Sequence, residues 1–163
     1  MSAGTARMSS FGPAIVRVAV GVVFVAHGAQ KLFGLWGGDL SGTAGFFAQL
    51  GLSPAYPLAI AVGVVEFAGG LLLISGAFTL MASALLLVDM LVAVWKAHLP
   101  NGFFLNWTNA PGSGHGIEFN LVLIAALASL MLTGPGALSF DHYRLREAES
   151  QAAGRARLRA GKV

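Results

Sequence analysis

Charged residues inside long apolar segments are the feature of this sequence that points most directly to chemistry. Three cationic and three acidic side chains interrupt four such segments: Arg17, Lys31, Lys96, Glu66, Asp89 and Glu118. A lone charge at membrane depth costs several kcal/mol, so residues of this kind usually face a bundle interior, pair with one another and mark a site. Because the signs balance, we expect opposite charges to be grouped inside the protein.

Two histidines accompany these charges. His27 comes four residues before Lys31, and His98 comes two residues after Lys96. Histidine is the side chain that titrates or binds metals near neutral pH. With depth estimated from the ~1.5 Å rise per helical residue, we predict one outward-facing polar pocket that binds a ligand, formed by His27, Lys31, Glu66, Lys96, His98 and Glu118.

Arg17 and Asp89 are predicted to form a separate structural ion pair on the cytoplasmic side of that pocket, because the long arginine side chain can stretch inward. Polar contacts in membrane bundles often only hold helices together, each contributing around a kcal/mol. We prefer that interpretation for Arg17 with Asp89. For the outer pocket, the sequence leaves ligand binding and simple helix association as open alternatives.

The elements that must position these residues are membrane-spanning helices. Of the 163 residues, 56% are hydrophobic and 10% are charged, whereas a soluble domain carries about a quarter charged residues. Four apolar stretches approach the ~20 residues that a bilayer-crossing helix needs, at residues 13–33, 57–75, 79–99 and 117–133. The sequence therefore predicts an all-α, integral membrane four-helix bundle.

Helical periodicity predicts which faces point inward. At 100° per residue, one face of the first span carries Arg17, Gly21, Phe24, Gly28 and Lys31. A stripe on the second span consists of Ala59, Gly63, Glu66 and Gly70. Small residues at this spacing let helix backbones approach closely in lipid, so we expect the two spans to pack through these faces.

The distribution of Lys and Arg predicts the orientation. None occurs between residues 32 and 95, whereas the last twenty residues hold six. By the positive-inside rule the tail is cytoplasmic, and four spans return the N-terminus to the same side. We expect a cytoplasmic segment at 1–12, a bundle at 13–140 and a basic cytoplasmic tail at 141–163.

The two long loops, residues 34–56 and 100–116, then lie outside. They contain many glycines and aromatic residues. Aromatic residues are typical of the membrane interface, and this belt is one interpretation. The other is a lid over the pocket, with residues 42–50 forming a short surface helix.

Composition also excludes several classes of function. There is no cysteine, which removes disulfides, thiolate metal ligands and covalent haem attachment. The pI of about 9.8 comes mostly from the tail, so it indicates membrane orientation and no nucleic-acid partner. We predict no metal site, since the histidines and carboxylates have no diagnostic spacing, and His115 is expected on the surface.

Taken in order, several short motifs resemble the DoxX family of small bacterial membrane proteins. They are His27 to Lys31, Glu66 to Gly70, His98 to Phe104, Gly116 to Glu118, Gly134 to Gly136 and Ser139 to Asp141. The resemblance implies a four-helix protein of the bacterial inner (plasma) membrane, in a group connected with redox processes. This group includes the related protein DoxD, which is similar to a subunit of a thiosulfate:quinone oxidoreductase. No catalytic residues are agreed for the family, so none can be transferred.

We therefore predict a membrane component or anchor of a quinone- or thiol/sulfur-linked redox system. Its cofactor is unknown, and a quinone is the candidate. The partners we expect are the lipid bilayer, a soluble or membrane redox protein and a second copy of the chain. No nucleotide-binding glycine motif is present, so the electron carrier must come from elsewhere.

Two alternatives remain from the sequence alone. One is a b-type haem held by His27 and His98, which we disfavour because an α-helical wheel places His98 almost opposite Asp89 and Lys96. The other is a non-catalytic scaffold or a small transporter subunit, although four spans are few for a transporter.

Overall fold

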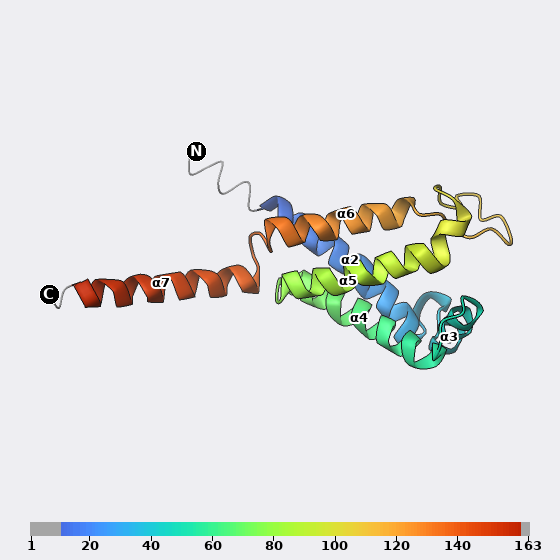
Figure 1. The fold of residues 1–163 in the computed structure, drawn as a ribbon, viewed down its shortest axis with the longest axis horizontal. Helices are drawn as coiled ribbons and strands as arrows, with labels where there is room; N and C mark the ends of the chain where they lie inside the picture. The colour runs from blue at the N-terminus through green and yellow to red at the C-terminus, as the bar shows by residue number, and fades with distance from the viewer. Residues whose placement is uncertain (1–10, 161–163) are drawn as a thin grey trace.

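Helices account for every regular element in the described part of the chain, which covers residues 11–160 of a computed structural model. The bundle consists of α2 (Phe11–Phe33), α4 (Ala55–Ser75), α5 (Thr79–Ala93) and α6 (Glu118–Thr133). Figure 1 shows these four helices side by side, with helix α3 at one end and helix α7 leaving from the other. The predicted all-α membrane bundle is confirmed.

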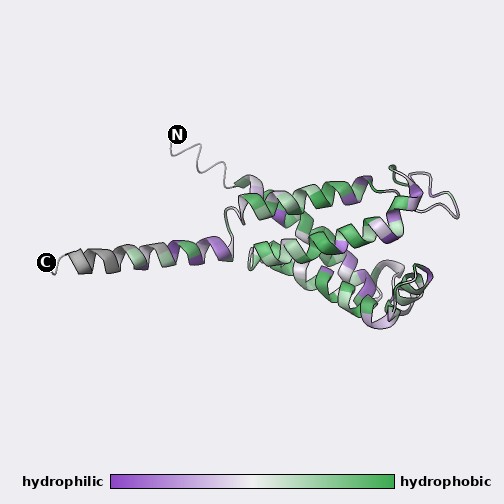
Figure 2. Cartoon of the chain, in the orientation of Figure 1, coloured by the Kyte–Doolittle hydropathy of each residue, from purple (hydrophilic) through white to green (hydrophobic). Residues whose placement is uncertain are grey.

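Three helical segments are long and apolar enough to cross a membrane: Phe11–Phe33, Ala55–Ser75 and Thr79–Asn101. Helix α6 is also apolar but has 16 residues. At ~1.5 Å per residue it spans about 24 Å, somewhat less than the ~30 Å hydrocarbon core. Most residues of the bundle helices are hydrophobic (Figure 2), and many of their large apolar side chains are exposed, as a lipid environment requires.

Helices α2 and α4 pack closely because glycine faces glycine. A Cβ atom added to Gly21 would lie 2.8 Å from the carbonyl oxygen of Gly70. At Gly28 an added Cβ would lie 2.7 Å from the Cα atom of Phe67. Both distances are too short for a real side chain, so the predicted approach of these two faces through small residues is confirmed.

The first long loop contains a 3₁₀ turn, η1 (Leu35–Gly37), and the helix α3 (Leu40–Gln49). Asp39 caps α3, since its carboxylate accepts a hydrogen bond from the backbone N–H of Gly42 at 2.5 Å. The short helix predicted in this loop is therefore present, and it packs against α4. We refer to this end of the bundle as the α3 end.

Arg17 lies toward the opposite end, where it is 1% exposed. Its guanidinium donates hydrogen bonds to five backbone carbonyls, those of Leu73, Ile74, Pro135, Ala137 and Leu138. Two of these carbonyls end α4 and three belong to the loop after α6. Carbonyls at a helix C-terminus carry partial negative charge, which a buried cation stabilises.

The predicted ion pair of Arg17 with Asp89 is consequently wrong. The donors of Arg17 are directed to main-chain carbonyls, and the salt bridge found within residues 11–160 joins two other side chains. The prediction considered only side chains of opposite charge, whereas arginine can also donate hydrogen bonds to main-chain carbonyls.

Two further caps stabilise the end of the bundle next to α7, which we call the α7 end. The carboxylate of Asp141 accepts hydrogen bonds from the N–H groups of Phe78, at 2.9 Å, and Thr79, at 2.8 Å, where α5 begins. Ser139 accepts from the N–H of His142 at 3.1 Å and so starts α7 (Phe140–Ala160). Unsatisfied N–H groups at both helix starts are thereby paired.

Helix α7 covers most of the predicted basic tail and extends away from the bundle (Figure 1). Its coloured residues are on the whole more hydrophilic than those of the bundle helices (Figure 2). The rest of the two predicted terminal segments, residues 1–10 and 161–163, lies outside the described residues.

Candidate functional site

A cavity of about 630 Å³ lies at the α3 end of the bundle. Helices α2, α4, α5 and α6 contribute its walls, and α3 together with the loop that contains His115 lines it further. Its volume is in the range of small-molecule sites, which are mostly apolar with a few polar groups that orient the ligand. The bundle therefore encloses a space large enough for a ring-sized ligand.

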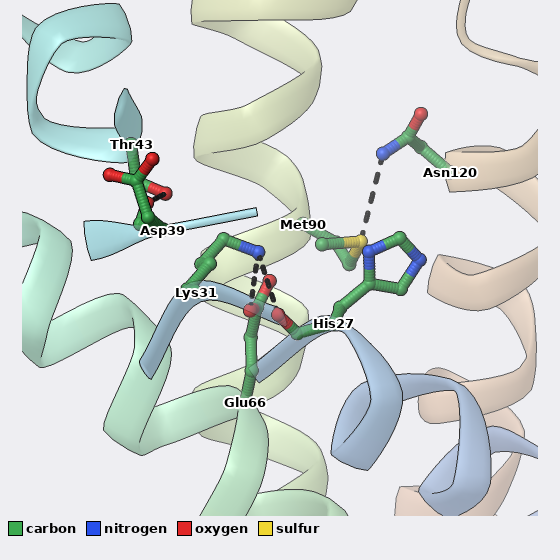
Figure 3. Close-up of polar contacts among 7 residues, drawn as sticks. All are labelled: His27, Lys31, Asp39, Thr43, Glu66, Met90 and Asn120. Atoms are coloured by element: carbon green, nitrogen blue, oxygen red, sulfur yellow. Dashed lines mark hydrogen bonds and ion pairs between the residues drawn. The ribbon is translucent and has the colours of Figure 1, made fainter. Parts of the chain in front are cut away.

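Lys31 and Glu66 form a salt bridge in this cavity. The Nζ atom of Lys31 lies 2.6 Å from Oε2 of Glu66, and the two side chains are 18% and 5% exposed. Figure 3 shows the ammonium between this carboxylate and the main-chain carbonyl of His27, which lies 3.5 Å away. The glycine-mediated contact of α2 with α4 brings the two residues together.

Asp89, on α5, lines the same cavity. Its Oδ2 atom is shielded from solvent and has no hydrogen-bond partner among the described residues. An ionised carboxylate without a partner is costly to bury. The three residues Lys31, Glu66 and Asp89, which we call the charged end of the cavity, thus contain two acids and one base.

The depth of the charged end follows from the helix positions. Glu66 is the twelfth of 21 residues in α4. Asp89 is the eleventh of 23 in the span Thr79–Asn101. Both acids are therefore near mid-height, about 15 Å from the start of their helices at ~1.5 Å per residue. Charges at this depth are the ones that most require a partner or a function.

The helix geometry changes after Ala93, where η2 (Val94–His98) is π-helical and η3 (Leu99–Asn101) is a 3₁₀ turn. A π-helix turns less per residue than an α-helix, so residues after it change face. His98 thereby lines the same cavity as Asp89 and Lys96. The α-helical wheel that disfavoured a haem assumed an unbroken α-helix, so it does not hold for His98.

The imidazole of His98 is fixed by a hydrogen-bonding distance of 2.9 Å between its Nδ1 atom and the carbonyl oxygen of His115. His115 in turn accepts a hydrogen bond from the N–H of Asn106 at its own Nδ1 atom. Lys96 directs its ammonium over the ring of Trp95, 4.2 Å from the centroid. These contacts orient the rim of the cavity.

The structure brings five of the six predicted pocket residues to the cavity: His27, Lys31, Glu66, Lys96 and His98. Glu118 does not line it; Phe119 and Asn120, which follow it in the first turn of α6, line the cavity instead. The predicted pocket thus has to be corrected at Glu118. Whether these residues bind a ligand remains a prediction.

Sequence reasoning missed several polar residues of the cavity. Asn120 lies within an apolar segment, and its Nδ2 atom is 3.6 Å from Sδ of Met90 (Figure 3). A polar residue in such a segment was a usable signal. His115 was expected on the surface but lines the cavity, and its position depends on a loop whose path the sequence does not indicate.

Metal binding has no support in the described ranges, where no group of three or more metal-ligating side chains comes together. Aromatic and aliphatic side chains form the remaining walls of the cavity, among them Phe24, Phe46, Phe47, Leu58, Val62 and Phe119. The site therefore combines a charged end with flat apolar walls. That arrangement fits an amphipathic organic ligand.

Fold and cavity together define a small helical membrane protein with a polar internal site. The DoxX family model matches residues 12–99, and the chain belongs to this family. An uncharacterized membrane protein of Mycobacterium tuberculosis, Rv3486, is 33% identical over 130 residues, which cover 77% of each chain.

Two further relatives have more informative names. The putative oxidoreductase CatD of Bacillus subtilis is 29% identical, over 81% of this chain and 86% of its own length. The inner membrane protein YphA of Escherichia coli is 29% identical, over 84% of this chain and 97% of its own. No solved structure matches the chain.

Proposed function

We propose that this protein is a membrane component of a quinone-linked redox system and that its cavity binds the quinone headgroup. The observation that carries the proposal is the charged end, where the mid-height acids Glu66 and Asp89 line a cavity with aromatic walls and Lys31 pairs with Glu66. A quinone combines a flat apolar ring with polar oxygen atoms. The cavity offers complementary surfaces for both.

The residues present fit the group. Phe46, Phe47 and Phe119 line the cavity and provide flat apolar surfaces for a ring. Lys31 and His27 supply nitrogen atoms that can donate hydrogen bonds to ring oxygens. When bound, a quinone supplies two-electron, two-proton redox chemistry.

The chain's own residues would bind the ring and manage protons. Glu66 holds the ammonium of Lys31 at 2.6 Å and so fixes the direction of its remaining donors. His27 lines the cavity beside this pair, and its imidazole is a group that can take or give a proton. The apolar walls limit the access of water to the ring.

Electrons have to be exchanged with another protein. The sequence contains no cysteine and no nucleotide-binding motif, so a soluble or membrane redox partner would provide the carrier. The name of the relative CatD, putative oxidoreductase, supports a redox role. A second copy of the chain is a further candidate partner.

The proposed location is the bacterial inner membrane, with both termini cytoplasmic and the cavity opening to the outer side. The basic tail supports this orientation through the positive-inside rule. The printed name of the relative YphA, an inner membrane protein, supports the location.

The proposal is tested by the quinone that the purified protein retains. We would purify the protein from membranes of a quinone-producing bacterium, extract the lipids and quantify quinone per protein by mass spectrometry. Wild type should be enriched in quinone over an unrelated membrane protein of similar size prepared in parallel. Absence of any enrichment would contradict the proposal.

A double variant, Lys31→Met with Glu66→Leu, tests whether the salt bridge is needed to retain quinone. Removing one partner of a buried pair costs about 3–5 kcal/mol, whereas replacing both leaves no unpaired charge. The double variant should therefore unfold at a higher temperature than either single variant but retain at least tenfold less quinone. Glu118→Gln serves as the control, since this acid lies outside the cavity and should leave quinone retention unchanged.

A b-type haem is the alternative with a specific observation in its favour. His27 and His98 line one cavity, and the contact of His98 Nδ1 with a carbonyl leaves its Nε2 atom available for a metal. The visible spectrum of the purified protein distinguishes the two. A Soret band that disappears in His98→Ala would favour haem.

A further inference from the structure

The charged end of the cavity has an excess of hydrogen-bond acceptors. Lys31 donates to Oε2 of Glu66 at 2.6 Å and approaches the carbonyl of His27 at 3.5 Å. Oδ2 of Asp89 has no partner within residues 11–160 and no access to solvent. The ammonium of Lys31 therefore pairs with Glu66, and Oδ2 of Asp89 is left without a donor.

Nearby donors are directed elsewhere. The ammonium of Lys96 lies over the ring of Trp95, at 4.2 Å. The amide of Asn120 points its Nδ2 atom to Sδ of Met90 (Figure 3). The Nδ1 atom of His98 contacts the carbonyl of His115. None of these contacts satisfies Asp89, and leaving a buried acceptor unpaired is unfavourable.

We propose that Asp89 accepts a hydrogen bond from a ring hydroxyl, so that the cavity selects the reduced, hydroxyl-bearing form of the ligand, a quinol, over the quinone. This inference rests on the proposed function and names the ligand form that the site takes. A quinone presents only acceptor oxygens, and such an oxygen facing the ionised carboxylate of Asp89 would leave both groups unpaired. A quinol presents an O–H donor of the kind that the carboxylate lacks.

The selectivity follows from chemistry and not from shape, since the two forms have nearly the same size. A site built to pair with a substrate hydroxyl strongly rejects an analogue without it, because its own polar group then stays unpaired. The aromatic walls hold both forms equally well. The charged end alone would distinguish them.

The test compares three ligands on detergent-purified protein without oxygen: a short-chain benzoquinol, the corresponding benzoquinone and the dimethyl ether of the quinol. The ether keeps the ring and both oxygens but has no donor. We expect the quinol to bind at least tenfold more tightly than the other two, as measured by quenching of tryptophan fluorescence or by calorimetry. Equal affinity of all three would overturn the inference and leave the proposed function intact.

A substitution of Asp89 tests the same preference for the quinol over the quinone. Asp89→Asn keeps the shape of the side chain and replaces one acceptor oxygen with an N–H donor, so the preference for the quinol should fall at least tenfold and the quinone should bind as well or better. Glu118→Gln removes an acid outside the cavity and should keep the wild-type preference.

The outcomes separate the two proposals. Failure of all three ligands to bind wild type would contradict the proposed function as well as this inference. An unchanged quinol preference in folded Asp89→Asn would show that Asp89 is not the acceptor. If Asp89→Asn does not fold, the comparison of quinol with its dimethyl ether on wild type still decides the inference.

Discussion

Arg17 is the residue with the clearest structural role. Five carbonyls from two separate segments accept hydrogen bonds from one buried guanidinium. This explains how a charge can be 1% exposed in an apolar bundle without an acidic partner. It also explains why the loop 134–139 returns to the end of α4.

Replacing Arg17 with Met should lower the free energy of unfolding by about 3 kcal/mol or more, because several buried carbonyls lose their donors. Arg17→Lys should recover only part of this loss, since an ammonium cannot match the planar five-donor fork of arginine. Denaturant titration in detergent micelles, followed by tryptophan fluorescence, measures the difference. Arg144→Ala, on an exposed position of α7, is the control and should change stability by no more than ~0.5 kcal/mol. Full stability of Arg17→Met would show that the guanidinium is dispensable.

The carboxylate of Asp141 complements Arg17 at the same end. It caps the start of α5, although it lies more than sixty residues later in the chain. The short motifs Gly134 to Gly136 and Ser139 to Asp141 therefore connect three helix ends. Their role is to fix the bundle, whereas the charged end of the cavity is formed by residues of α2, α4 and α5.

Among the elements, the contact of α2 with α4 sets the geometry of the site. Gly28 lies against the backbone of Phe67, one residue beyond Glu66, so this contact fixes the position of the salt bridge. Any side chain at Gly28 would push the helices apart. The packing of small residues thus controls the site from outside the cavity.

We predict that Gly28→Val destabilises the protein by about 2–3 kcal/mol and weakens quinone retention, because the added side chain overpacks the interface. Thermal unfolding and lipid extraction measure the two effects. Gly45→Ala on α3 is the matched control, since an added Cβ there meets no atom within 4 Å. It should be neutral or stabilising by up to ~1 kcal/mol. Wild-type behaviour of Gly28→Val would mean that the close approach is unimportant.

Much of this arrangement could be predicted from the sequence. The helical wheel placed Lys31 and Glu66 on inward faces, and the structure pairs them. The partners of Arg17 could not be predicted, because they are main-chain carbonyls, whose positions the pattern of charged side chains does not reveal. His98 was correctly placed in the pocket, but its position together with Asp89 and Lys96 could not be explained, since the π-helical turn at Val94–His98 breaks the 100° periodicity on which the wheel depends.

Asp89 and Glu118 show a second limit. Both are acids in apolar segments, and sequence alone assigned Glu118 to the pocket and Asp89 to another pair. The structure reverses these positions. Both helices begin within one residue of the predicted positions. The sequence pattern does not fix how each helix is rotated about its own axis against its neighbours, and this rotation decides which acid reaches the cavity.

At the scale of the whole molecule, the two ends of the bundle differ in character. The α7 end is stabilised by hydrogen bonds to backbone groups and continues into a polar helix. The α3 end carries the long loops (Figure 1) and the cavity. This asymmetry agrees with a structural cytoplasmic end and a ligand-binding outer end. The orientation itself is a prediction.

Reporter fusions test the orientation. Alkaline phosphatase, which is active only outside the cytoplasm, should be active when inserted in the loop 106–113 and inactive when fused after residue 163. The positive-inside rule gives the physical reason, since six Lys and Arg residues lie in the tail. The opposite pattern would place the cavity on the cytoplasmic side.

The central claim is that a quinone-type ring binds in the cavity at the charged end. A short-chain benzoquinone that carries a photoreactive group on its tail tests this directly when the labelled peptides are identified by mass spectrometry. We expect labelling within Leu40–Gln49 and Thr79–Asn101. Excess unlabelled quinol should suppress this labelling, and the double variant Lys31→Met with Glu66→Leu should lose it. Labelling confined to lipid-facing residues such as Val22 and Leu132, with no competition by the quinol, would contradict it.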